Sequence, residues 1–155
     1  MQVSEGRIGR IFILRLEDDE VIPTCIEQLA QQKGIKFGWV TVIGCLEKGD
    51  VAMGPKDGGE RPPQPMMIPM DGVHEMLAAG LIAPNSEGRP ILHIHGAMGR
   101  AGHTLAGCLR EGSSVWCYAE AVIYEINGTS GERILDQESG FVMLDLNQND
   151  NNHAK

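Results

Sequence analysis

Three of the five histidines in this 155-residue chain lie within a short stretch. His93 and His95 fall in an apolar run, 90–95, whose composition predicts a β-strand, and alternate side chains of a strand share one face. Two imidazoles on one face can bind a common metal ion, and His103, which follows a glycine-rich turn, could supply a third nitrogen. The spacing therefore predicts a metal site on His93, His95 and His103, with zinc as the expected ion.

Two further side chains are candidates for the same site. Cys108 is a soft donor that competes with His103 for the place of third ligand, and the spacing leaves both open. Glu120, in an otherwise apolar run, could be a ligand, a residue that orients one, a base, or only the partner of an arginine. A third interpretation is that the histidines are only strand residues and that the chain is an assembly scaffold that binds no metal.

Three protein ligands leave one position on zinc open. Such a position could activate water or polarise a carbonyl group, which would permit hydrolytic or lyase-type chemistry on a small molecule bound at the metal. The sequence names no substrate, so no reaction is assigned, and Glu120 is the one candidate catalytic residue.

The amino-acid composition indicates the class of protein to which this chain belongs. A chain with 42% hydrophobic and 22% charged residues is typical of a soluble globular protein, and we expect one domain over 1–147 followed by a disordered polar tail at 148–155. No apolar run reaches the roughly 18 residues of a membrane span, and the first residues lack the pattern of a signal peptide. These features predict a cytoplasmic protein with no membrane partner.

The net charge of -8 bears on nucleic acid binding. Proteins that hold DNA by its phosphates present a basic face, whereas the arginines here are scattered and form no basic cluster. The charge therefore does not support DNA as a partner.

The order of patterned segments predicts an α+β fold with a mainly antiparallel sheet and a few flanking helices. A helix is expected from about Ile22 to a stop at Gly34, and a second, short helix at 72–80. Strands are expected at 7–16, which should be mostly buried, and at 38–46, 50–53, 66–70, 90–95, 103–109, 113–126, 133–135 and 140–146, with a loop at 55–65.

Several of these segments, taken in order, resemble the plant-and-prokaryote-conserved (PPC) domain. The resemblance lies in Arg15-Leu16, then 38–44 (GWVTVIG), then 88–96 (GRPILHIHG), then 120–123 (EAVI), and it covers about 8–146. In plants this domain follows AT-hook motifs in nuclear DNA-binding proteins, whereas in prokaryotes it forms a stand-alone chain. No AT-hook motif is present here.

The resemblance implies an antiparallel sheet flanked by helices, and a homotrimer. It also implies that some stand-alone members hold a metal on the histidines that match His93 and His95. Many relatives carry Gly-Gly-His-Leu next, and 101–104 (AGHT) looks like its counterpart, which favours His103 over Cys108 although two of its four residues differ. DNA binding or regulation is the alternative function, and it rests on association with the family alone.

Overall fold

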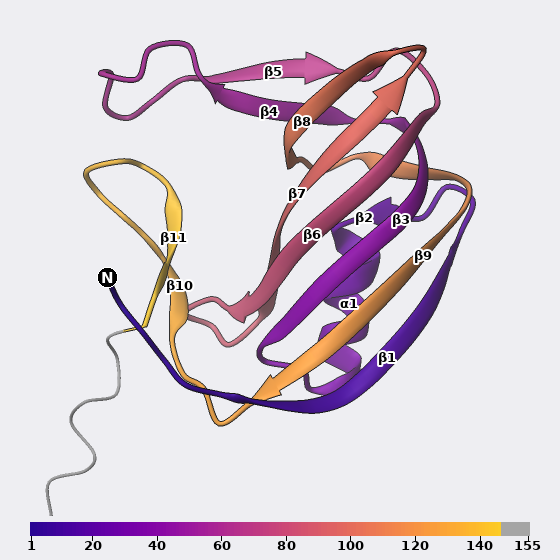
Figure 1. Cartoon of the computed structure of the whole chain (residues 1–155). Coiled ribbons are helices and arrows are strands. Elements are labelled where there is room, and N and C mark those ends of the chain that lie inside the picture. The colour runs from indigo at the N-terminus through magenta and orange to yellow at the C-terminus, as the bar shows by residue number, and fades with distance from the viewer. Residues whose placement is uncertain (147–155) are drawn as a thin grey trace, which may run out of the picture.

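The computed structural model describes residues 1–146, which form a bent antiparallel sheet, one helix and a separate two-stranded ribbon (Figure 1). The strand order of the large sheet is β1-β9-β3-β6-β7-β8-β4-β5, and β2 pairs with the start of β9. The strands of this sheet are β1 (Arg7–Glu17), β2 (Val21–Ile22), β3 (Gly38–Lys48), β4 (Asp50–Pro55), β5 (Pro65–Pro69), β6 (His74–Pro84), β7 (Pro90–Arg100), β8 (His103–Leu109) and β9 (Ser113–Asn127). The ribbon pairs β10 (Glu132–Leu135) with β11 (Val142–Asp145). The prediction of a mainly antiparallel sheet is confirmed, while the tail expected at 148–155 lies outside the described residues.

The helix α1 (Thr24–Lys33) begins directly after Pro23 and ends at Gly34. Gly34 has a left-handed backbone with φ of 67°, which glycine adopts without a steric penalty, and this ends the helix where the sequence predicts. Ile26 and Ala30 are buried against the sheet. In the described part of the chain, no helix is long and apolar enough to cross a membrane.

The core lies between α1 and one face of the sheet, which we call the inner face. Along β7, Leu92, Ile94 and Met98 point into this core, while His93, His95 and Ala97 alternate with the inward positions and are on the opposite, outer face. Val40 of β3 and Ile123 of β9 extend the core toward β1. The side chains that alternate with these core residues therefore form the surface of the outer face.

The helix expected at 72–80 is wrong, because β6 runs through this region. Val73, Met76 and Leu77 have helical spacing in the sequence, but in the structure Met76 and Ala78 are buried while Leu77 is exposed, which is the alternation of a strand. Pairing with β3 on one side and β7 on the other makes β6 a central strand. Among the described residues the sheet is therefore flanked by one helix rather than by several.

Strand β1 is present, but the expectation that it is mostly buried is wrong for the single chain. Only Leu16 is fully buried, whereas Ile11 and Ile13 are exposed on the outer face. Within the described residues, β1 is an edge strand and β9 is its one partner. Apolar side chains of β1 therefore lie on both faces of the sheet, although only the inner face packs against a core.

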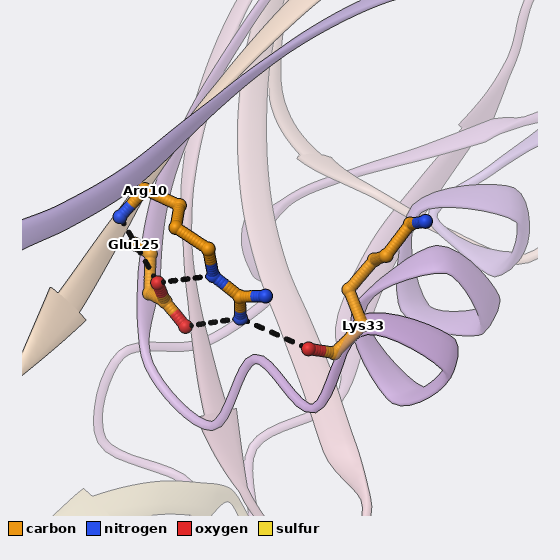
Figure 2. Close-up of polar contacts among 3 residues, drawn as sticks. All are labelled: Arg10, Lys33 and Glu125. Atoms are coloured by element: carbon orange, nitrogen blue, oxygen red, sulfur yellow. Dashed lines mark hydrogen bonds and ion pairs between the residues drawn. The ribbon is translucent and has the colours of Figure 1, made fainter.

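A cluster of three residues joins this edge of the sheet to the end of α1 (Figure 2). The Arg10 guanidinium donates to both carboxylate oxygens of Glu125, with Nε–Oε2 and Nη2–Oε1 distances of 2.8 and 2.6 Å, and the backbone N–H of Arg10 also donates to Oε2 at 3.0 Å. Nη2 further donates to the backbone carbonyl of Lys33 at 2.9 Å. Since Glu125 is buried, this arrangement supplies a charged partner to a carboxylate that has lost its water.

Candidate metal centre

His93 and His95 lie side by side on the outer face of β7, as their spacing predicts. Their Nε2 atoms are 3.0 Å apart, and the two rings meet edge to face with their planes at 81°. Two nitrogens bound to one tetrahedral zinc ion are separated by about 3.4 Å, given Zn–N bonds of about 2.1 Å. The two imidazoles thus need only a small separation to hold one ion between them.

The third donor in this group is Cys108, from the neighbouring strand β8. Cys108 pairs directly with His95 across the two strands, so both side chains project from the same face. The ligand atoms of His93, His95 and Cys108 all lie within 4.8 Å of one another. Two imidazole nitrogens and one thiol sulfur are a donor set that zinc accepts, and they leave its fourth position open.

His103 lies apart from this group within the chain. It pairs with Arg100 beside the turn that joins β7 to β8, five residues along β7 from His95, which corresponds to about 16 Å. The structure thus brings two of the three predicted histidines together with the alternative donor, Cys108. His74, expected to lie in a helix, is a buried residue of β6 whose Nδ1 is 2.7 Å from the carbonyl of Gly72.

Glu120 is on the outer face as well, but it lies far from the histidines. Its partners across β9 are Arg15 of β1 and Ile43 of β3, and β3 and β6 separate β9 from β7. Three strand spacings correspond to about 14 Å, so Glu120 does not reach the His93–His95 pair within one chain.

A cavity of about 820 Å³ opens beside the two histidines and Cys108. Its walls come from β4, the 55–65 loop, β8, β10 and the 140–144 segment, so the ribbon β10-β11 faces the β4-β5 hairpin across it (Figure 1). Arg110 and Arg133 are the charged residues among its described lining side chains. No local sequence pattern marks Arg133, because its burial depends on where the ribbon packs, whereas Arg110 lies two residues after Cys108.

The surroundings of the cavity shift the pKa values of two residues that line it, His93 and Arg133. Burial lowers the pKa of His93 below its ordinary value, and the nearby charges of His95, Arg133 and Arg110 lower it further. Burial also lowers the pKa of Arg133, against the opposing influence of Glu27. A lowered pKa favours the neutral imidazole of His93, which is the form that binds metal ions.

The fold is shared with several solved structures. A metal-containing protein from Archaeoglobus fulgidus matches with a TM-score of 0.80 and 22% identity, over 93% of this chain and 99% of that one. A plant- and prokaryote-conserved protein from Pyrococcus horikoshii matches with a TM-score of 0.77 and 23% identity, over 94% and 100% of the two chains. A candidate DNA-binding protein from Bacteroides thetaiotaomicron matches with a TM-score of 0.76 and 20% identity, over 94% and 98%.

No curated protein matches the chain. The family model for the Plants and Prokaryotes Conserved (PCC) domain matches residues 3–127, which include every strand of the large sheet. The resemblance noted in the sequence is therefore confirmed over most of its length, and the chain belongs to the PCC domain family.

Proposed function

We propose that this chain is a metal-binding module that holds one zinc ion on His93, His95 and Cys108. The observation that carries the proposal is the convergence of three metal-ligating atoms within 4.8 Å of one another, from two adjacent strands. The ligands project from the middle of a hydrogen-bonded sheet, which holds their backbones in a fixed register. The match to a metal-containing protein of the same fold agrees with this proposal.

Metal analysis of protein purified without an affinity tag tests this function. We expect about one zinc ion per chain in the unaltered protein and less than a tenth of that in His93→Ala and in His95→Ala. Each substitution removes one of three ligands from an exposed site, so circular dichroism should show that both variants keep the fold. Equal zinc content in all three proteins, or none in the unaltered one, would exclude the proposal.

We further propose that the protein works as a homotrimer, the state that the family resemblance implies. The support is an apolar patch on the outer face, with Ile13 85% and Leu77 64% exposed. The other large members of this patch are Ile11, Trp39, Ile43 and Tyr124. An exposed apolar surface of this kind is typical of an interface between subunits.

The trimer leads to a prediction about Leu77. Sedimentation equilibrium should give three times the 16.8 kDa chain mass for the unaltered protein, and the mass of one chain for Leu77→Asp, because a buried charge without a partner opposes association. The matched control is Ile68→Asp, which places the same charge at an exposed position of the edge strand β5 and should stay trimeric. A monomeric unaltered protein, or a trimeric Leu77→Asp variant, would contradict this assignment.

DNA binding is the alternative function, and its support is the description of two structural neighbours, from Bacteroides thetaiotaomicron and Ralstonia eutropha, as candidate DNA-binding proteins. The net charge of -8 opposes it, because contacts to phosphates need concentrated positive charge. Retention on duplex DNA that weakens steeply with salt would favour this alternative over the metal module.

A further inference from the structure

The cavity beside the metal centre has an unusual charge for so acidic a chain. The protein carries a net charge of -8, yet the described residues that line this cavity include two arginines and no carboxylate. Positive groups gathered in a concave site create a local potential opposite to that of the whole molecule. The cavity is therefore suited to a negatively charged ligand.

Of the two arginines, Arg133 gives the stronger indication of an anion site. The residue is 6% exposed, and its guanidinium donates to the backbone carbonyls of Leu81 at 2.8 Å and Ile91 at 3.4 Å. These acceptors are neutral, and no ion pair within residues 1–146 involves Arg133. The carboxylate of Glu27 influences Arg133 electrostatically but accepts its own hydrogen bond from the Leu92 N–H. A buried cation without a contacting anion is costly, and an anion in the cavity would relieve that cost.

Arg110 provides the second positive group in the cavity lining, and its charge, like that of Arg133, acts on His93. Its guanidinium has no hydrogen bond or ion pair among the described residues, whereas Arg10, Arg15 and Arg89 each pair with a glutamate. A guanidinium presents a planar set of donors that matches a carboxylate. Arg110 is thus free to turn toward a ligand in the cavity.

The remaining lining is mostly apolar, which indicates what the anion is attached to. Phe141, just before β11, and Val142 and Met143 of β11 are about half-exposed, and Pro63 and Pro65 also line the cavity. Apolar walls with a few polar groups are typical of sites for small organic molecules, and about 820 Å³ falls in the volume range of such sites. An inorganic anion alone would leave these walls uncovered.

We propose that the cavity binds a small organic carboxylate, with its charged group on Arg133 and Arg110 and its apolar body against Phe141, Val142 and Met143. This inference deepens the proposed function, because it names the class of ligand that shares the cavity with the metal ion. The positive charge of the two arginines favours a carboxylate group, and the apolar wall favours a ligand with a hydrocarbon body.

Titration calorimetry of the zinc-loaded protein with matched probes tests the inference. The probes are 4-methylpentanoate, its neutral analogue 4-methylpentanamide, and inorganic phosphate. We expect the carboxylate to bind at least tenfold more tightly than the amide, because the amide lacks the charge that the arginines attract. It should also bind more tightly than phosphate, which has no apolar body. An amide as tight as the carboxylate, or a phosphate as tight, would overturn the inference.

Arginine variants connect the affinity to this cavity. Arg110→Gln should weaken carboxylate binding at least fivefold, while Arg7→Gln, an exposed arginine of β1 outside the cavity, should leave it unchanged. Arg133→Gln should weaken it more, and Arg110→Gln keeps the test valid if loss of the buried Arg133 impairs folding. Unchanged affinity in Arg110→Gln and in a folded Arg133→Gln would overturn the inference.

The test separates this inference from the metal proposal. Zinc content, measured on the same samples with saturating zinc, should be equal in the unaltered protein, Arg110→Gln and Arg7→Gln, since neither substitution replaces a ligand. Loss of carboxylate affinity with full zinc content supports the anion site on its own evidence. A protein that lacks zinc but still selects the carboxylate through Arg110 would refute the metal site alone.

Discussion

Replacing Cys108 by serine should raise the dissociation constant for zinc at least 100-fold, whereas His103→Ala should change it less than twofold. The reason is geometric, because Cys108 pairs with His95 across β7 and β8 while His103 pairs with Arg100 at the far end of the same hairpin. Loss of a residue that only orients a ligand costs about 10- to 100-fold in affinity, so loss of a ligand itself should cost more. Competition with a chromophoric chelator measures the constants, and the exposed His103 provides the matched control.

Cobalt substitution gives this prediction a second readout. Co²⁺ bound to a thiolate absorbs in the near ultraviolet through charge transfer from sulfur, and this band should be present in the unaltered protein and in His103→Ala but absent from Cys108→Ser. If His103→Ala weakens zinc binding as strongly as His93→Ala, and the charge-transfer band is missing from the unaltered protein, the third ligand is His103, reached by another arrangement of chains or of the hairpin.

The placement of the histidine pair follows from the local sequence, whereas the identity of the third donor does not. Alternation along one strand places His93 and His95 on one face whatever the rest of the fold does. The choice between Cys108 and His103 depends on the register of two strands, which the turn between them sets. Ala101 and Gly102 both have positive φ, at 49° and 82°, as in a two-residue hairpin turn. A turn recognised at Ala101-Gly102 would have placed Cys108 opposite His95 from the sequence alone.

The segments that misled the sequence analysis did so for different physical reasons. In β6 the inward positions include Ala78, which has only a methyl group, and Gly80, which has no side chain. Strand alternation is therefore hidden in the sequence, and the spacing of Met76 and Leu77 resembles that of a helix. β1 carries apolar side chains on both faces, which is typical of a buried strand. Residues 1–146 cover only its inner face and leave Ile13 exposed.

Other parts of the site depend on contacts between distant segments. Arg133 follows the last strand of the large sheet, and its guanidinium reaches the carbonyls of Leu81 and Ile91 about 40 to 50 residues away in sequence. No local pattern marks such a residue, because its burial is decided by how the β10-β11 ribbon packs. The cavity that Arg133 lines therefore cannot be predicted from the sequence.

The second large effect is expected at Glu125 of β9, the strand next to the edge strand β1 and far from the cavity. Glu125 accepts three hydrogen bonds from Arg10, which hold the pKa of its carboxyl group down at about 2, and the same guanidinium reaches the end of α1 through Lys33 (Figure 2). Breaking a fully buried ion pair costs about 3–5 kcal/mol, but Arg10 is half-exposed and solvent screens its charge. We therefore expect Glu125→Gln to lower the free energy of unfolding at pH 7 by about 2 kcal/mol, measured by urea denaturation.

The pH dependence of that difference identifies its cause. The carboxyl group has a pKa of about 2 in the folded protein and an ordinary value of 4.5, so its ionised form stabilises the fold above the ordinary value and loses this effect as the pH falls toward 2. The gap in unfolding free energy between the unaltered protein and Glu125→Gln should therefore shrink steadily from pH 5 to pH 2. Glu17→Gln, which removes the carboxylate of an exposed pair with Arg15, is the matched control and should lower the free energy of unfolding at pH 7 far less than Glu125→Gln does. A gap that stays constant down to pH 2 would mean that the shape of Glu125, rather than its charge, stabilises this edge.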